Sequence, residues 1–210
     1  MQAVTIERIR RIEEKPTLDP SENLAREERY LQQVMTPSFR VWRNARCVVL
    51  GRFLDPGAEV FSMRALDLGV PVLRRRSGGG AVYHDPGNIN YSIYLPDAGT
   101  LCAGVKSTLV ALSFPVTSLL DHLGAEWTWE PPNNVFVSGR KVSGSAEWRH
   151  RGKLLHHGTL LVDSDLDTMW ELLKPGGRSA IAPVANLRDT THWLTAERAS
   201  ELLTEELERH

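Results

Sequence analysis

The segment Arg74-Arg75-Arg76-Ser77-Gly78-Gly79-Gly80-Ala81-Val82-Tyr83-His84-Asp85 places three arginines directly before three glycines, between two stretches of strand-like composition. Glycines let a ligand approach the backbone and leave N–H groups that can point at an anion, and an arginine fork pairs with phosphate or carboxylate oxygens. The spacing matches neither the dinucleotide-binding fingerprint nor the Walker A loop. Taken alone, the segment fits an anion-binding loop and a tight hairpin with a solvated basic flank equally well.

Strand-like segments surround this loop, and turn residues between them predict two antiparallel units. The first unit joins residues 70–76, 81–84 and 89–95 through the glycines and Asp85-Pro86-Gly87. The second unit joins residues 135–137, 141–148 and 154–162 through Ser138-Gly139 and Arg151-Gly152. Short strands are also expected at residues 39–42 and 47–50.

Helices are predicted before, between and after these strands. Asp19-Pro20-Ser21-Glu22 is typical of a helix start, with Asp19 as the cap and Glu22 completing a capping box. A middle helical region over residues 105–123 is interrupted by Pro115, and two helices follow over residues 166–173 and 195–207. Residues 1–210 therefore predict a single α+β domain, with mixed β-sheets flanked by helices.

The composition limits the expected partners and compartment. The 210 residues are 41% hydrophobic, which is enough for one sizeable core. The 25 Lys and Arg residues nearly balance the 26 Asp and Glu residues, so no global field attracts nucleic acid or an anionic membrane. Neither a signal peptide nor a membrane-spanning apolar run is visible, and two cysteines form no disulfide framework. We therefore expect a cytoplasmic protein with no nucleic-acid or membrane partner.

Two further segments carry candidate site residues. Lys141-Val142-Ser143-Gly144-Ser145-Ala146 places small residues after a lysine, and small side chains leave room beside a strand for an elongated ligand. A lysine at a turn exit is, taken alone, the commoner interpretation. In His156-His157-Gly158-Thr159, adjacent strand residues point to opposite faces, so at most one histidine faces a site. No zinc spacing and no nucleophilic triad is visible, and Cys102 has no local base to activate it.

Together these motifs resemble the lipoate-protein ligases, within the biotin/lipoate ligase superfamily. Residues 74–85 with Gly87-Asn88 are similar to the family signature Arg-Arg-x-Ser-Gly-Gly-Gly-x-Val-x-His-Asp-x-Gly-Asn, and residues 141–146 to its Lys-x-x-Gly-x-Ala signature. The opening helix and residues 49–52 and 156–161 also match, so the resemblance covers nearly the whole chain. It implies the class II synthetase-like biotin/lipoate ligase fold in one catalytic domain, without the small accessory domain of many lipoate ligases.

The resemblance also implies an activity with ATP and Mg²⁺ as cofactors. Lipoate and ATP would give lipoyl-adenylate and pyrophosphate, and a lysine of a lipoyl-carrier protein would then take the acyl group and release AMP. Lys141 would be catalytic, between the acyl carboxylate and the α-phosphate. The residues expected to contact ATP or lipoyl-adenylate are Arg75, Ser77, Gly78, Gly79, Gly80, Ala81, Val82, Tyr83, His84, Asp85, Asn88, Lys141, Ser143, Gly144, Ala146, His157, Gly158 and Thr159.

Two departures from the family pattern leave alternatives open. Asn134 stands where the family commonly has an aspartate, so the metal ligands are undefined. The chain also ends about where the family's catalytic domain ends, so it is either a compact ligase or a subunit that needs a small accessory partner.

Other functions on the same fold are disfavoured by missing residues. An octanoyl or lipoyl transferase needs a cysteine thiolate in the pocket, and no cysteine follows Cys102. A biotin ligase would carry a Gly-Arg-Gly-Arg-type loop, which this chain lacks. A non-catalytic binder of lipoyl-adenylate stays open as an alternative. The sequence determines neither the carrier protein nor the preference between lipoate and octanoate.

Overall fold

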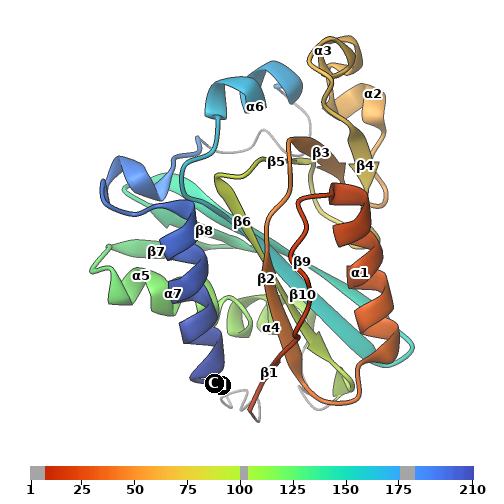
Figure 1. Ribbon diagram of the computed structural model, residues 1–210, viewed down its shortest axis with the longest axis vertical. Coiled ribbons are helices and arrows are strands. Elements are labelled where there is room, and N and C mark those ends of the chain that lie inside the picture. The colour runs from red at the N-terminus through yellow and green to blue at the C-terminus, as the bar shows by residue number, and fades with distance from the viewer. Residues whose placement is uncertain (1–7, 100–103, 176–182) are drawn as a thin grey trace.

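A seven-stranded sheet and a three-stranded sheet organise the chain (Figure 1), for which the computed structural model describes residues 8–99, 104–175 and 183–210. Both sheets are mixed: β1–β2 and β3–β4 pair in parallel, and the other pairs are antiparallel. The large sheet has the order β1 (Arg10–Arg11), β2 (Ser38–Trp42), β6 (Asn88–Leu95), β10 (Lys153–Leu161), β9 (Arg140–His150), β8 (Asn134–Val137) and β7 (Trp127–Glu130). The small sheet has the order β4 (Val72–Arg74), β3 (Cys47–Leu50) and β5 (Val82–His84).

Helices cover both sheets, which confirms the expected α+β class. They are α1 (Pro20–Gln33), α2 (Pro56–Glu59), α3 (Ser62–Asp67), α4 (Val105–Ala111), α5 (Phe114–His122), α6 (Leu166–Leu172) and α7 (Ala196–Glu208), with a 3₁₀ turn at Leu187–Asp189. The small sheet, α2, α3 and α6 gather at one end of the large sheet (Figure 1). None of the helices in the described ranges is both long and apolar enough to cross a membrane.

The first predicted antiparallel unit is wrong. The loop of residues 77–80, called the glycine loop below, joins β4 to β5, but β3 lies between these two strands in the sheet. β4 pairs with β3 in parallel and β5 pairs with β3 antiparallel. All four residues of β3 are buried, as suits a central strand with a partner on each edge. β5 and β6 likewise belong to different sheets, so Asp85-Pro86-Gly87 carries the chain from one sheet to the other. The Asp85 carboxylate accepts hydrogen bonds from the backbone N–H groups of Gly87 and Asn88 and fixes this crossing.

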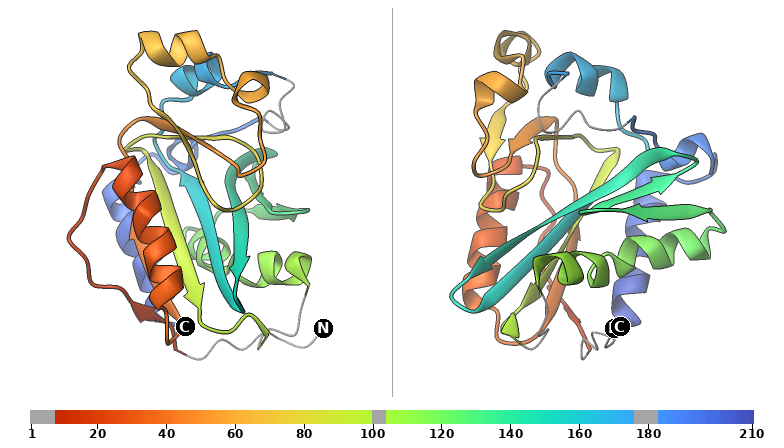
Figure 2. Two further views of the ribbon diagram at one scale, coloured as in Figure 1. Left: turned by 90° about the vertical axis from the view of Figure 1, so that its right-hand side faces the viewer. Right: turned by 180° about the vertical axis from the view of Figure 1, so that it is seen from behind.

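The second predicted unit is confirmed as the consecutive strands β8, β9 and β10. Its two turns place Ser138 and Gly139 at φ 50° and 71°, and Arg151 and Gly152 at φ 50° and 81°. Two successive residues with positive φ are typical of the type I′ hairpin turn, whose twist matches that of the strands. Figure 2 shows the resulting β9–β10 hairpin running across the molecule.

The predicted helix starts are mostly confirmed. Asp19 caps α1 by accepting from the N–H groups of Ser21 and Glu22. The predicted capping box is wrong, because the Asp19 N–H donates to the Thr17 hydroxyl and Glu22 pairs with Arg26 at 2.8 Å. The middle helical region breaks into α4 and α5, with Pro115 in the first turn of α5 as expected.

Side chains on opposite faces of the large sheet belong to separate cores. Leu31 of α1 packs with Tyr94 and Leu155 on one face. Tyr91 and Leu154, which point the other way, pack with α5 and α7 on the opposite face. The small sheet contacts the large sheet on the face under α1, where His84 of β5 packs edge-on against Trp42 of β2.

Gly51, directly after β3, allows the glycine loop to lie against the small sheet. A Cβ atom at Gly51 would overlap the carbonyl oxygen of Gly79, and the Gly78 carbonyl carbon is also within 3.2 Å. Gly79 itself has φ 89°, a conformation that side chains with a Cβ rarely adopt. The loop position therefore depends on both glycines.

We expect Gly51→Ala to lower the free energy of unfolding by at least about 2 kcal/mol, because a backbone carbonyl cannot yield to the added methyl group without moving the loop. Urea unfolding followed by circular dichroism measures this change. Gly104→Ala is the matched control, since a Cβ atom there meets nothing within 4 Å and the residue has φ −65°. Equal stability of the two variants would contradict the prediction.

Candidate active site

One row of residues crosses five strands of the large sheet and forms the floor of a cavity of about 500 Å³. The row consists of Trp42, Asn90, Thr159, Gly144 and Asn134, which lie opposite one another on neighbouring strands. All five line the cavity because directly paired residues share a face of a sheet. A cavity of this size is typical of a small-molecule site.

Lys141 lies at one end of the cavity, near the start of β9. Its ammonium group occupies the space that a side chain at Gly144 would fill, because a Cβ atom there would lie 2.8 Å from Nζ. Within the described ranges, Nζ has no hydrogen bond or ion pair. Burial, followed by the positive charge of Arg75, lowers the Lys141 pKa below its usual value of 10.5. Lys141 is therefore a partly desolvated cation available to an anionic ligand.

Arg75 lies under the glycine loop and holds it in place. Its guanidinium donates to the Ser77 hydroxyl at 2.8 Å and to the backbone carbonyls of Val49, Gly78 and Gly80 at 3.1, 2.7 and 2.9 Å. Burial lowers the Arg75 pKa to about 10. Four of the five N–H donors of the side chain are thus used inside the protein. In this conformation Arg75 presents no open fork to a phosphate and acts on a ligand mainly through its charge.

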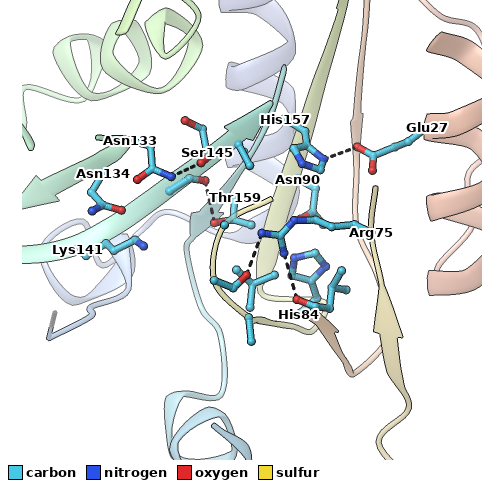
Figure 3. Close-up of a pocket in the computed structure, with 18 of the residues that line it drawn as sticks. Glu27, Arg75, His84, Asn90, Asn133, Asn134, Lys141, Ser145, His157 and Thr159 are labelled. Atoms are coloured by element: carbon cyan, nitrogen blue, oxygen red, sulfur yellow. Dashed lines mark hydrogen bonds and ion pairs between the residues drawn. The ribbon is translucent and has the colours of Figure 1, made fainter. Parts of the chain in front are cut away.

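A hydrogen-bonded chain through Ser77 and His157 connects Arg75 to Glu27 of α1, and Figure 3 shows its last bond, between His157 and Glu27. Ser77 Oγ lies 2.7 Å from His157 Nε2, and His157 Nδ1 lies 2.8 Å from Glu27 Oε1. Because a carboxylate only accepts, Nδ1 carries a proton. Ser92 also donates to Glu27 at 2.8 Å. The chain links the glycine loop, β10 and α1, and it places a buried carboxylate near the buried guanidinium.

The glycine loop forms the wall opposite the sheet and offers unpaired backbone donors. Gly79 and Gly80 line the cavity. In the part of the chain that the structure describes, no acceptor is bonded to the N–H groups of Gly78, Gly79 or Gly80. Successive N–H groups of this kind form anion-binding concavities. The loop can thus receive phosphate oxygens through its backbone.

Most of the residues expected from the sequence line this cavity. They are Arg75, Gly79, Gly80, Ala81, Val82, His84, Lys141, Gly144, Ala146, His157, Gly158 and Thr159. The expected contacts that do not line it are Ser77, Gly78, Tyr83, Asp85, Asn88 and Ser143. Several of these support the wall: Ser77 joins Arg75 to His157, Tyr83 packs in the core of the small sheet, and Asp85 fixes the sheet crossing.

Sequence reasoning missed several lining residues, among them Leu24, Glu27, Trp42 and Asn90. Glu27 is buried on the same stripe of α1 as Leu31 and Asn23. A polar residue on the apolar stripe of a helix is a signal of a buried polar contact. In β6, Asn88, Asn90 and Ser92 alternate with larger apolar residues, and the whole strand is buried, so these polar residues are a similar signal.

The residues around Lys141 do not fit a protein-held Mg²⁺ ion. Among the described residues, no group of three His, Cys, Asp or Glu side chains could hold a metal. Asn133 and Asn134 supply amides, and the Asn133 amide donates to the Ser145 carbonyl. The carboxylate that lines the cavity, Glu27, is tied to His157 and Ser92 at the end away from Lys141 (Figure 3). Mg²⁺ prefers carboxylates and phosphates.

The cysteines do not supply a nucleophile within the described ranges. Cys47 is fully buried in β3, and burial raises its pKa to about 12. Cys102 lies outside the described residues. A thiolate nucleophile needs a lowered pKa and access to substrate, and Cys47 has neither.

Residues 19–208 match the sequence model of the lipoyl protein ligase A/B catalytic domain. The chain belongs to this family. Lipoate-protein ligase LplJ of Bacillus subtilis is 35% identical over 159 residues, which are 74% of this chain and 46% of the relative, so the chain spans about half of that relative's length. A protein of Aeropyrum pernix assigned as lipoate-protein ligase A is 35% identical over 186 residues, covering 85% of this chain and 69% of that protein. These findings confirm the resemblance drawn from the motifs.

A solved structure supports the same fold. The bipartite lipoate-protein ligase of Thermoplasma acidophilum, described with its E2 lipoyl domain, has a TM-score of 0.82 and 25% identity over 98% of this chain and 84% of that chain. The expected biotin/lipoate ligase fold is confirmed by this likeness.

We expect Glu27→Gln to lower the free energy of unfolding by about 2 kcal/mol at pH 7, because it removes a buried charge-assisted acceptor. Burial alone raises the Glu27 pKa, but His157, Ser92 and Arg40 together lower it below 4.5. A lowered pKa stabilises the fold above the unfolded value, and this contribution is lost as pH falls through the folded value. The difference from the parent should therefore shrink below pH 4.5.

Urea unfolding between pH 3.5 and 7 measures this dependence. Glu201→Gln on the solvent side of α7 is the control, because its side chain is 62% exposed and its pair with Arg198 contributes little. If the difference in free energy of unfolding between Glu27→Gln and the parent stays constant down to pH 3.5, the charge of the carboxylate is not what stabilises the site.

Proposed function

We propose that this protein activates lipoate with ATP as lipoyl-adenylate and transfers the lipoyl group to a lysine of a lipoyl-carrier protein. The observation that carries the proposal is the position of Lys141. Its ammonium lines the cavity together with the glycine loop, and neither the ammonium nor the N–H groups of Gly78, Gly79 and Gly80 have a partner among the described residues. A cation and backbone donors around one cavity suit a reaction between a carboxylate and a phosphate.

The first step joins two anions, so the site must offset charge. A carboxylate oxygen forms a bond to the α-phosphorus, and the bond from this phosphorus to pyrophosphate breaks. Lys141 neutralises the approaching carboxylate and the α-phosphate, and the N–H groups of Gly79 and Gly80 donate to phosphate oxygens. Preorganised donors of this kind stabilise developing charge in a site that excludes water. Leu24, Trp42 and Val49 enclose the apolar acyl chain at the opposite end.

The second step needs a nucleophilic amine from a partner. A neutral lysine amine of the carrier attacks the acyl carbon, the bond to the phosphate oxygen breaks, AMP leaves, and the nitrogen releases one proton to solvent as the amide forms. The Thermoplasma acidophilum ligase described with an E2 lipoyl domain supports a carrier of this class. We infer that Mg²⁺ arrives on the ATP phosphates, because the described residues near Lys141 offer it no carboxylate.

The decisive experiment is intact mass spectrometry of a purified lipoyl domain incubated with this protein and lipoate, with and without ATP and Mg²⁺. A gain of one lipoyl group only with ATP supports a self-sufficient ligase. A parallel incubation replaces lipoate with an octanoyl-carrier protein. Transfer of the octanoyl group to the lipoyl domain without ATP would identify a transferase and overturn the proposal. Lipoyl-AMP without transfer would indicate a need for a small accessory subunit or another carrier.

We expect Lys141→Ala to reduce lipoyl-AMP formation by at least about 100-fold, because the charge that offsets the two anions is lost. The change removes an ammonium group that has no partner among the described residues and leaves the backbone bonds of Lys141 to Pro183 and Ala185 in place, so the fold should be retained. Liquid chromatography with mass detection of lipoyl-AMP measures the effect. Lys106→Ala on the exposed side of α4 is the control, and near-normal turnover of Lys141→Ala would sink the assignment.

The adenylation step should weaken at alkaline pH before free lysine would titrate. Burial and Arg75 lower the Lys141 pKa below 10.5, and only the charged form offsets the anions. The rate therefore falls as pH rises through this lowered value. Lipoyl-AMP formation must be followed without the carrier, because the acceptor amine becomes more nucleophilic over the same range. A rate that stays flat up to pH 10.5 would contradict the role of the Lys141 charge.

A further inference from the structure

A chain of buried amides fixes one ring nitrogen of His84 as a hydrogen-bond acceptor. Arg40 donates to Asn23 Oδ1, which orients the Asn23 amide. Asn23 Nδ2 then donates to Asn44 Oδ1 at 2.9 Å, so Asn44 presents its NH₂ group to His84 Nδ1 at 3.0 Å. An amide NH₂ only donates. His84 Nδ1 is therefore the acceptor.

The proton of His84 must then lie on Nε2. Burial, followed by the positive charge of Arg75, lowers the His84 pKa to about 3, so the ring is neutral at physiological pH. Nε2 is buried and has no partner among the described residues. His84 lines the cavity, and because its Nδ1 is taken by Asn44, the Nε2–H is the polar atom of the ring that is left for a ligand.

Asn90 provides a second unpaired donor on the cavity floor. Its Oδ1 accepts from Asn88 at 3.1 Å, while its Nδ2 is buried without a partner in the described ranges. Trp42 is opposite Asn90 in the sheet and packs edge-on against His84, with ring centroids 6.2 Å apart. Both donors thus lie around Trp42, at the end of the cavity away from Lys141 (Figure 3).

At this end of the cavity Leu24, Trp42 and Val49 supply an apolar lining, and the polar side chains of Glu27, Arg75 and His157 there are hydrogen-bonded within the protein. A saturated acyl chain would fill it and leave both N–H donors without acceptors. The two sulfur atoms of a dithiolane ring are weak acceptors and occupy the distal end of a lipoyl chain. Sites with donors reject an analogue that lacks the matching acceptor more strongly than apolar sites reject a change in size.

We propose that His84 Nε2 and Asn90 Nδ2 donate to the dithiolane sulfurs and make this cavity selective for lipoate over octanoate. The inference rests on the proposed function, with Lys141 at the carboxylate end. His84 and Asn90 are specificity determinants, and Asn44 is a positioning residue that sets the His84 tautomer.

The first test compares lipoate with octanoate in the unmodified protein. Isothermal titration calorimetry gives the Kd of each acid, and formation of acyl-AMP gives kcat/KM. We expect at least a tenfold preference for lipoate in both. If both acids are activated with equal Kd and equal kcat/KM, the selectivity inference is overturned and the proposed function stands. Binding of neither acid, with no acyl-AMP formed, would overturn both.

Variants of His84 separate the donor from the shape of the side chain. His84→Phe keeps an aromatic ring without an N–H, so the ratio of the lipoate kcat/KM to the octanoate kcat/KM should fall about tenfold. His84→Gln retains an N–H donor and should keep most of the preference. His150→Phe, outside the cavity and against Trp148, controls for the loss of a histidine. An unchanged preference in folded His84→Phe would refute the role of Nε2.

Asn44→Asp tests the tautomer without changing His84. A carboxylate at this position accepts from Nδ1–H and draws the ring proton away from Nε2, so the cavity edge loses its donor. Nitrogen-15 chemical shifts of the His84 ring report the tautomer directly. We expect the chemical shifts of Nδ1 and Nε2 to change places, and the preference for lipoate over octanoate to fall in the same variant. Exchange of the tautomer with full retention of the preference would overturn the proposal.

Discussion

The cavity depends on the hydrogen bonds that the buried guanidinium of Arg75 makes to the glycine loop. The guanidinium binds three backbone carbonyls and the Ser77 hydroxyl, so the glycine loop is held by a charged group that has left water. Such a group is costly unless it is hydrogen-bonded and compensated. The chain through His157 to Glu27 supplies a compensating carboxylate from α1, and thereby fixes the small sheet, the large sheet and the first helix relative to one another.

This arrangement divides the charges of the site between two tasks. The side chains of Arg75 and Glu27 are hydrogen-bonded within the protein and hold the cavity walls in place. The Lys141 ammonium has no partner among the described residues and is available to a ligand. The polar floor between them is set by register, since residues directly opposite each other on five strands must share a face. Gly144 then makes room for the Lys141 ammonium, so a glycine in the strand determines where the positive charge lies.

Local signals in the sequence predicted local structure well. Ser138-Gly139 and Arg151-Gly152 indicated their hairpins because the turn conformation is encoded by the turn residues. The insertion of β3 between β4 and β5 could not be found this way, because pairing between strands far apart in sequence leaves no local trace. The motif around Lys141 and the glycines located most of the cavity. Glu27, Asn90 and Trp42 were missed because their role arises only when the strands and α1 meet.

The row of residues that forms the cavity floor also has a consequence for the order of folding. β10 is the strand that joins β6 to β9, and it is made after all other members of the row. Before it emerges during synthesis, the β2–β6 and β8–β9 halves have no shared edge. Local hairpins can form early, but long-range pairing comes later because it requires closure of long loops. A nascent chain that ends before β10 therefore lacks the strand that joins Trp42 and Asn90 to Gly144 and Asn134, and the cavity floor is complete only once β10 has paired along both of its edges.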